Sequence, residues 1–172
     1  RQIVVVVALV ITLVVNWLAN ALPLNGVTTG EVSDSFDVYF VPAGYVFAIW
    51  GLIYLGLIAY AVYQALPAQR ENSYLRRIGY LFVLSSLANA VWIFLWHYQL
   101  VALSMIAMGV LLVALIVMYL RLKIGKSAAD NKEKWFVHIP ISLYLGWITI
   151  ATVANATALL VEVGWNRFGL TE

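Results

Sequence analysis

Residues 78–120, IGYLFVLSSLANAVWIFLWHYQLVALSMIAMGVLLVALIVMYL, decide the fold, because these 43 residues include no Asp, Glu, Lys or Arg. A single α-helix of this length would reach roughly 65 Å at about 1.5 Å per residue, twice the roughly 30 Å hydrocarbon core of a bilayer. The chain is therefore expected to fold back at the short polar sequence His97, Tyr98 and Gln99. Two membrane-spanning helices are predicted here, over residues 78–97 and 100–120.

Three further stretches share this lack of charge, over residues 3–22, 41–66 and 135–161. The chain of 172 residues is 64% hydrophobic and 10% charged, whereas an average soluble domain has roughly 25% charged residues. Helix-length apolar runs, rather than short alternating strands, indicate spanning helices whose backbone hydrogen bonds are internal. The sequence thus predicts an all-α integral membrane protein, a five-transmembrane-helix bundle that forms one domain over residues 1–172.

The basic residues predict the orientation of this bundle. Nine of the ten Lys and Arg residues precede the first span or lie in the connections after the second and fourth spans, whereas Arg167 falls on the opposite side. Because cytoplasmic segments are enriched in Lys and Arg, the N-terminus is predicted inside and the C-terminus outside. The outside loop over residues 23–40 combines turn-forming residues with Phe36, Tyr39 and Phe40, so we expect an ordered lid.

The first span has a second interpretation. Arg1, the apolar run and the small residues around Ala19 and Ala21 imitate the three regions of a secretory signal peptide. The apolar run is longer than a usual signal core, so we favour a membrane-spanning helix.

Several functional classes fit this sequence poorly. Short basic loops do not build the clustered basic face of a nucleic-acid-binding protein, and the absence of cysteine excludes thiolate catalysis and Cys-based metal sites. The predicted spans hold no carboxylate, lysine or cysteine, so we expect neither a catalytic site nor a metal site. His97 and His138 fall at opposite membrane faces, where they could not share a metal. Either could be an axial haem ligand, although a hydrogen-bonded surface histidine is the simpler interpretation.

Neutral polar and aromatic residues form stripes along the predicted helices. At helical spacing, each of these groups lies on one helix face: Tyr144, Trp147, Ala151 and Asn155; Ser85, Asn89, Trp92 and Trp96; Trp50 and Tyr54; Asn16 and Asn20. One interpretation is that the stripes join helices through hydrogen bonds, while the small residues Gly51, Gly56, Ala88 and Ala151 allow close approach. The other is that they converge on an aromatic-walled pocket for a ligand.

The motifs in these stripes resemble those of the tryptophan-rich sensory protein or translocator protein (TspO) family. The sequence YLGWITIATVAN, residues 144–155, is similar to the family's fifth-helix pattern, and LANAVW, residues 87–92, is similar to its third-helix pattern. The sequence VPAGYVFAIWGLIY, residues 41–54, resembles the entry to its second helix, although the family usually has more prolines there and a Trp where this chain has Tyr45. The fifth-helix proline, Pro140, also lies four residues before Tyr144 rather than next to it.

This resemblance implies a bacterial-type protein of the inner (cytoplasmic) membrane that binds a hydrophobic ligand, as a sensor or a carrier. A porphyrin or haem is the implied ligand, no cofactor is obligatory, and the implied partners are the lipid bilayer and a second copy of the chain in a homodimer. The expected ligand-binding residues are Trp50, Tyr54, Asn89, Trp92, Tyr144, Trp147 and Asn155. The alternative is a structural or accessory subunit of a larger membrane complex, for example a photosynthetic pigment–protein complex, without a small-molecule pocket of its own.

Overall fold

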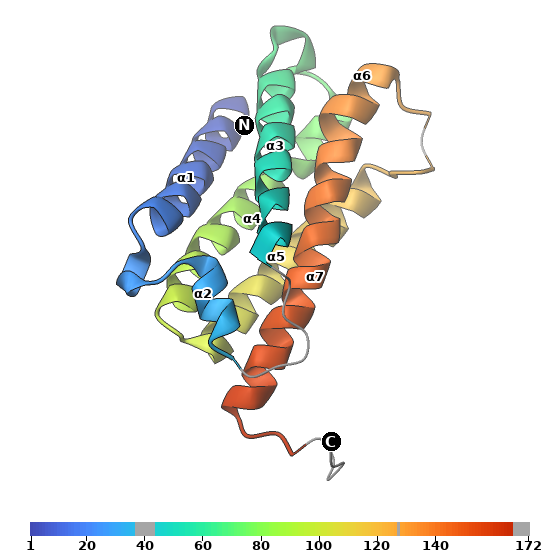
Figure 1. Cartoon of the computed structure of the whole chain (residues 1–172). Coiled ribbons are helices and arrows are strands. Elements are labelled where there is room, and N and C mark those ends of the chain that lie inside the picture. The colour runs from blue at the N-terminus through green and yellow to red at the C-terminus, as the bar shows by residue number, and fades with distance from the viewer. Residues whose placement is uncertain (37–43, 127, 167–172) are drawn as a thin grey trace.

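A computed structural model describes residues 1–36, 44–126 and 128–166 of the chain. Figure 1 shows long helices that run roughly side by side, linked by short connections. Five of them are long and apolar enough to cross a membrane, which confirms the predicted number. They are α1 (Gln2–Ala21), α3 (Ile49–Ala65), α4 (Ser73–His97), α5 (Val101–Arg121) and α7 (Ile139–Glu162). The shorter elements are η1 (Leu24–Gly26), α2 (Thr29–Asp34), η2 (Gly44–Ala48), η3 (Pro67–Gln69), α6 (Asn131–Glu133) and η4 (Lys134–His138).

Two helix starts differ from the charge-free stretches. The α-helical part of the second span begins at Ile49, after the 3₁₀ turn η2, and residues 41–43, including Pro42, lie outside the described residues. Helix α4 begins at Ser73, five residues before the predicted start at residue 78. The Asn72 side chain caps it by accepting hydrogen bonds from the backbone N–H groups of Tyr74 and Leu75, at 3.0 and 3.2 Å. Charge-free stretches therefore mark the part of a helix that lies in lipid, whereas capping residues mark where the helix begins.

The predicted fold-back after α4 is confirmed. Gln99 adopts a left-handed conformation, with a φ of 55°, and its N–H donates to the Trp96 carbonyl at 3.0 Å. The Leu100 N–H donates to the Leu95 carbonyl at 2.9 Å. This pair of bonds is a Schellman motif, which satisfies carbonyl groups that a helix end would otherwise leave free. Helix α5 then returns along α4, and at its far end the Arg121 guanidinium donates to the Arg77 carbonyl at 2.9 Å.

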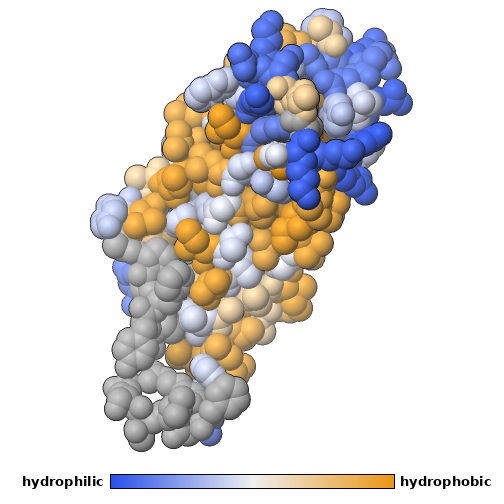
Figure 2. Space-filling view, turned by 90° about the vertical axis from the view of Figure 1, so that its right-hand side faces the viewer, coloured by the Kyte–Doolittle hydropathy of each residue, from blue (hydrophilic) through white to orange (hydrophobic). Residues whose placement is uncertain are grey.

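Charge is concentrated at one end of the bundle. The N-terminus, η3 and the connection between α5 and α7 lie at the end opposite the C-terminal end of α7 (Figure 1). Figure 2 shows strongly hydrophilic residues gathered at this end above an apolar body. All nine Lys and Arg residues of the described chain belong to segments at this end, and Arg167 lies outside the described residues. The charge asymmetry behind the predicted orientation is thus a property of the fold, while the sidedness itself stays a prediction.

Helices α4, α5 and α7 pack around the core, and α1 and α3 lie against them. The polar stripes of α4 and α7 face this interior: Ser85, Asn89, Trp92 and Asn155 are all buried. Of the two glycines on α3 that were expected to allow close approach, Gly56 does so, because a Cβ there would lie 3.3 Å from the Pro140 side chain of α7. The expectation for Gly51 was wrong: a Cβ there would meet nothing within 4 Å. Glycine at position 51 lies on the outward face of α3.

Candidate ligand-binding site

The stripes of α3, α4 and α7 face one another next to α2. Together with α2 they enclose a small space that we call the aromatic pocket. It is lined by Thr29, Ser33, Phe47, Trp50, Trp92, Trp96, Trp147, Ala151, Ala154 and Asn155. Its volume is about 30 Å³. The predicted convergence of aromatic side chains is therefore present, but their rings fill most of the room between the helices.

Hydrogen bonds hold one wall of the aromatic pocket together. The Trp92 indole N–H of α4 donates to the Asn155 Oδ1 of α7 at 2.8 Å. The Asn155 Nδ2 donates to the Ser104 hydroxyl of α5 at 3.0 Å, and Ser104 also donates to the Val101 carbonyl at 2.8 Å. All three of these polar side chains are buried. Asn155 thus joins three helices, because each of its amide groups has a partner on another helix.

Ring contacts form the opposite wall, and Trp50 is at their centre. Its ring centroid lies 5.4 Å from that of Tyr54, 6.4 Å from that of Tyr144 and 6.0 Å from that of Trp147. The Phe47 ring meets Trp147 edge-on, with centroids 5.9 Å apart and the planes at 77°. Tilted and edge-on arrangements are those that aromatic side chains prefer. Trp50 therefore fixes the position of α3 against α7.

Two buried amide or indole groups near the aromatic pocket have donors without a partner among the described residues, namely the Asn89 Nδ2 and the Trp147 Nε1. The oxygen of Asn89 is used, because it accepts a hydrogen bond from the Asn16 Nδ2 at 2.6 Å and so joins α4 to α1. Native proteins leave few buried donors unpaired. Of the two, only Trp147 lines the aromatic pocket, so only its N–H is placed to contact a ligand.

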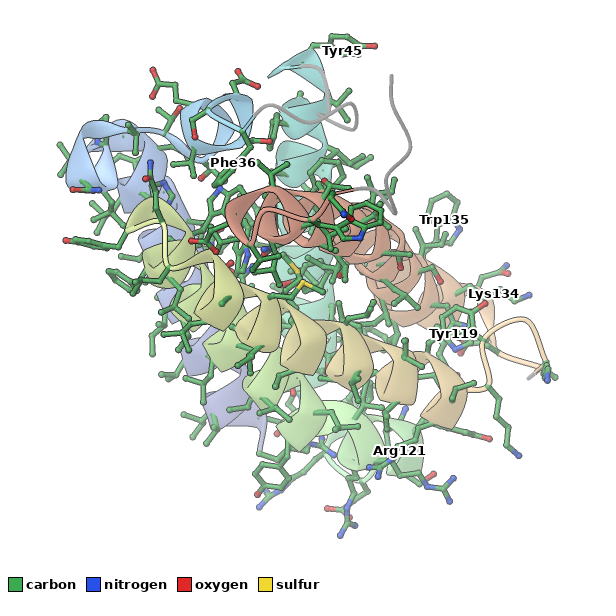
Figure 3. The ribbon with its side chains drawn as sticks, turned by 90° about the horizontal axis from the view of Figure 1, so that it is seen from below. Phe36, Tyr45, Tyr119, Arg121, Lys134 and Trp135 are labelled. Atoms are coloured by element: carbon green, nitrogen blue, oxygen red, sulfur yellow. The ribbon has the colours of Figure 1, made fainter. Side chains whose placement is uncertain are left out.

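Helix α2 covers the aromatic pocket as part of the predicted lid. The Trp96 indole N–H donates to the Thr29 carbonyl at 3.2 Å, and the His97 Nε2 lies 3.4 Å from the Thr29 hydroxyl. The Phe36 ring packs 5.7 Å from that of Trp96. Residues 23–36 thus pack against the end of α4, and their role as a lid stays a prediction. Tyr39 and Phe40 lie outside the described residues. Tyr45 lies apart from this site: its side chain is 83% exposed and points away from the bundle in Figure 3.

The start of α2 is fixed by a capping box. The Thr28 hydroxyl accepts from the Glu31 N–H at 3.3 Å, and the Glu31 carboxylate accepts from the Thr28 N–H at 2.6 Å. The backbone N–H and the hydroxyl of Thr28 both lower the pKa of Glu31, because they stabilise its charged form. Glu31 therefore supports the lid in its ionised state.

A larger hollow, which we call the lateral groove, lies between α1 and α3 with α2 at one end. It is lined by Leu13, Asn16, Trp17, Asn20, Ala21, Thr28, Thr29, Gly30, Phe47, Trp50, Tyr54, Ile58 and Ile93. Its volume is about 840 Å³. Trp17 of α1 and Ile58 of α3 are 67% and 42% exposed, so the lateral groove is open at the side of the bundle. Thr29, Phe47 and Trp50 line both hollows.

The predicted ligand-binding residues divide between these two hollows. Trp50 lines both, Tyr54 lines the lateral groove, and Trp92, Trp147 and Asn155 line the aromatic pocket. Asn89 and Tyr144 line neither and lie behind the walls, where Asn89 bonds to Asn16 and Tyr144 packs on Trp50. The predicted set omitted Phe47 and Thr29, which no periodic pattern singled out. It also omitted Trp96, although its place in the α4 stripe, one turn after Trp92, was a usable signal.

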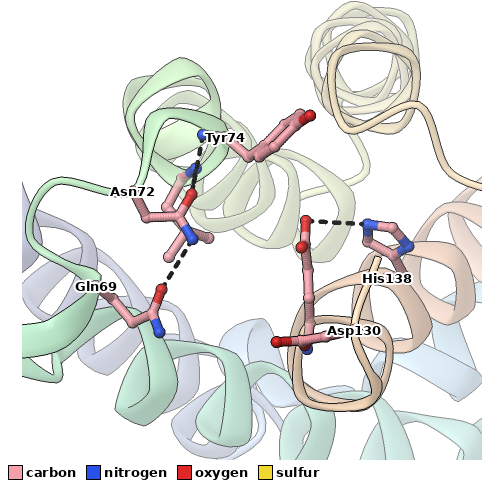
Figure 4. Close-up of polar contacts among 7 residues, drawn as sticks. Gln69, Asn72, Tyr74, Asp130 and His138 are labelled. Carbon is pink, nitrogen blue, oxygen red and sulfur yellow. Dashed lines mark hydrogen bonds and ion pairs between the residues drawn. The ribbon is translucent and has the colours of Figure 1, made fainter. Parts of the chain in front are cut away.

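Neither histidine is the surface residue that was expected. His97 is fully buried, and its ring nitrogens lie 2.8 Å from the Ile93 carbonyl and 3.4 Å from the Thr29 hydroxyl. His138 is 7% exposed and lies 3.5 Å from the Glu133 carboxylate at the charged end, in the region of Asp130, Asn72 and Gln69 (Figure 4). No group of three His, Asp or Glu residues that could hold a metal occurs in the described part of the chain.

The fold and the site together define a helical integral membrane protein with five candidate membrane-spanning helices and a groove that is open at the side of the bundle. The model of a protein family described as TSPO-like protein matches residues 2–172. The chain therefore belongs to the TSPO-like protein family, as its motifs predicted. This membership indicates a membrane sensory or ligand-binding protein. Searches of curated proteins and of solved structures found no match.

Proposed function

We propose that this protein binds a flat hydrophobic ligand of the tetrapyrrole class, a porphyrin or haem, in the lateral groove and senses or carries it within the membrane. The observation that carries this proposal is the volume of the lateral groove, about 840 Å³. Pockets for small molecules and cofactors commonly measure about 300 to 1,000 Å³. The aromatic pocket, at about 30 Å³, is too small for a macrocycle.

The chemistry of the groove wall supports a flat aromatic guest. Trp17, Phe47, Trp50 and Tyr54 contribute aromatic rings to it, and such rings stack on large π-systems. Asn16 and Asn20 contribute amide groups from α1, which can orient a ligand through hydrogen bonds. The exposed rim at Trp17 and Ile58 lets a hydrophobic ligand enter from the bilayer without crossing water.

We propose binding rather than catalysis. The side chains that line the aromatic pocket and the lateral groove are all neutral, whereas general acid–base or nucleophilic catalysis requires a titratable or nucleophilic group beside the substrate. We also propose that the charged end faces the cytoplasm, since nine basic residues lie there.

The test is a titration of the purified protein in lipid nanodiscs with protoporphyrin IX, followed by porphyrin absorbance. We expect saturable binding, and we expect Trp50→Ala to raise the Kd about tenfold because it removes the ring that borders the lateral groove. Trp135→Ala is the matched control, since Trp135 is exposed at the charged end and should leave the Kd unchanged. Absence of saturation in the wild-type protein, or equal effects of the two substitutions, would overturn the proposal.

A structural subunit of a larger membrane complex is the second candidate function. The observation that favours it is the filling of the aromatic pocket by ring contacts centred on Trp50, which are those of a packed helix interface. Stoichiometric co-purification with a larger complex, combined with no saturable porphyrin binding, would establish this alternative over the first.

A further inference from the structure

A third hollow, which we call the basic pocket, lies at the charged end of the bundle. It measures about 530 Å³ and is formed where the start of α1 meets the end of α3, the turn η3 and the start of α4. Hydrogen bonds fix this junction: the Gln2 amide donates to the Gln64 and Leu66 carbonyls at 2.6 and 3.2 Å, and the Gln64 amide donates to the Gln2 carbonyl at 3.2 Å. Among the described residues, the basic pocket shares no lining residue with the aromatic pocket or the lateral groove, so its role is independent of the proposed function.

Positive charge dominates the wall of the basic pocket. Its charged lining residues are Arg1, Arg70, Arg76 and Glu71. Glu71 accepts a hydrogen bond from Arg76 at 3.2 Å, but the two side chains are 79% and 62% exposed, and exposed ion pairs of this kind hold their partners weakly. Within residues 1–36, 44–126 and 128–166, no carboxylate lies at ion-pair distance from Arg1 or Arg70. The basic pocket therefore has three guanidinium groups against one carboxylate, a surplus of positive charge that attracts anions.

The guanidinium of Arg1 is held in place at this wall. Its Nη2 donates to the Gln69 carbonyl at 3.0 Å. Its aliphatic part lies against Gly79 of α4, where a Cβ would come within 2.8 Å of the Arg1 Cγ, so a larger residue at position 79 would displace the Arg1 side chain. The other terminal nitrogen, Nη1, is buried and has no hydrogen-bond partner in the described part of the chain. A cation that is partly withdrawn from water without a counter-charge destabilises the fold, so an anion bound beside Arg1 would stabilise it.

The surroundings of the basic pocket indicate which anion fits it. Guanidinium groups bind phosphate through paired, charge-assisted hydrogen bonds. Ile3 also lines the pocket and is 78% exposed, and it begins an outward apolar face of α1 that continues through Val7 and Val10, which are 50% and 52% exposed. A molecule with a phosphate in the basic pocket and acyl chains on this face of α1 is a phospholipid. Basic pockets at the ends of spanning helices bind anionic lipid headgroups in this way.

We propose that the basic pocket binds the phosphate of an anionic phospholipid such as phosphatidylglycerol, with Arg1, Arg70 and Arg76 as its donors and the acyl chains against α1. Phosphatidylglycerol carries a net negative charge and phosphatidylcholine carries none, so the surplus of guanidinium groups selects the former. The bound lipid joins the start of α1 to the connection between α3 and α4, because Arg1 precedes α1 and Arg70 lies in that connection.

The test is a titration of the purified protein in non-ionic detergent with dioctanoyl phosphatidylglycerol, with the midpoint of thermal unfolding measured at each lipid concentration. We expect saturable stabilisation, and we expect dioctanoyl phosphatidylcholine to need an about tenfold higher concentration for half of the effect. Arg76→Gln should raise the half-saturating concentration of phosphatidylglycerol about fivefold, because it removes one charged donor. The neighbouring Arg77→Gln is the matched control, since Arg77 is also exposed on α4 but does not line the basic pocket.

A second variant, Arg1→Gln, should raise the half-saturating concentration about tenfold, because Arg1 is the more buried donor. Each shift is measured against the lipid-free midpoint of the same variant, so a variant that is only less stable still reports its affinity. Equal weakening by Arg76→Gln and Arg77→Gln would show attraction by the charged end as a whole and overturn the inference, as would equal effects of the two lipids.

A further titration with inorganic phosphate at constant ionic strength separates the two possible sources of the phosphate group. We expect inorganic phosphate to stabilise the protein only at concentrations about a hundredfold above those of phosphatidylglycerol, because it lacks the acyl chains that pack on α1. If inorganic phosphate acts at the same concentration as the lipid, the basic pocket binds a soluble phosphate and the assignment to a phospholipid fails.

Discussion

The two sides of helix α3 are built differently. Toward α7, Gly56 allows the Pro140 side chain to approach closely, and the Trp50 ring packs on Tyr144 and Trp147, leaving a space of about 30 Å³. Toward α1, α3 presents Trp50, Tyr54 and Ile58 to a groove of about 840 Å³. Helix α3 is therefore closely packed where it faces α7 and borders a groove where it faces α1.

This difference shows how the fold combines stability with room for a guest. Helix α1 packs along α4 through one buried face, which includes Val5, Leu9 and Thr12. The Gln2 amide donates to the Gln64 carbonyl at 2.6 Å near one end, and Asn16 donates to Asn89 further along. Another face of its second half, which includes Leu13, Trp17 and Asn20, lines the lateral groove. Stability is thus expected to depend mainly on the α7 side, and ligand affinity mainly on the α1 side.

The largest expected effect comes from Asn155→Leu, on the packed side. This substitution leaves the buried Trp92 indole N–H without its acceptor, which costs about 1 to 3 kcal/mol, and it leaves Ser104 only its bond to the Val101 carbonyl. We expect a loss of about 2 to 3 kcal/mol in the free energy of unfolding, measured by denaturation in mixed micelles. Asn20→Leu, on the exposed face of α1 in the lateral groove, should change stability by less than about 0.5 kcal/mol. Equal losses for the two asparagines would contradict the comparison.

A substitution at Gly56 tests the close approach of α3 and α7 directly. The side chain of Gly56→Leu would collide with Pro140, since a Cβ alone lies 3.3 Å from it, and overpacking of this kind costs about 1 to 3 kcal/mol. Gly51→Leu is the matched control on the same helix, where a Cβ meets nothing within 4 Å. We expect a clear drop in thermal stability for position 56 alone. A comparable drop for position 51 would show that both faces of α3 are packed.

The attachment of α2 to α4 can be weakened through His97. His97→Leu removes the ring nitrogen that lies 3.4 Å from the Thr29 hydroxyl. We expect amide hydrogen exchange across α2 to become about fivefold faster, the effect of losing about 1 kcal/mol of local stability, while exchange in α7 stays unchanged. His138→Leu, at the charged end, should leave α2 unaffected, so a similar acceleration from that variant would argue against a specific contact.

The smallest expected effect is a pH dependence of α2. The pKa of Glu31 is lowered in the folded state by its hydrogen bonds with Thr28, so its contribution is fully present above the unfolded-state pKa and is lost as the pH falls through the lowered value. Amide exchange at the start of α2 should therefore accelerate, after correction for intrinsic rates, as the pH is reduced from 7 toward 3. Glu31→Gln should remove this dependence. A pH response that persists in Glu31→Gln would assign it to another group.

The sequence predicts those features that depend on local composition. Charge-free stretches long enough to cross a bilayer give the five helices, and helical periodicity places Trp92, Trp147 and Asn155 on inward faces. The role of Ser104 could not be predicted, because a single hydroxyl in the apolar helix α5 forms no stripe. The presence of two separate hollows, the aromatic pocket and the lateral groove, could not be predicted either. It depends on the position of α1 relative to α3 rather than on any pattern within one helix. The burial of His97 depends likewise on α2, which packs over the end of α4.

The connection between α4 and α5 has a consequence for biogenesis. Only Tyr98, Gln99 and Leu100 separate the two helices, and their other ends are joined by the bond from Arg121 to the Arg77 carbonyl. A connection this short does not allow a stable insertion intermediate in which one helix spans the bilayer and the other remains in water. The pair is therefore expected to enter the bilayer as a single helical hairpin during synthesis. The basic residues at the start of α4 and at the end of α5 would then stay on the side from which the hairpin was inserted.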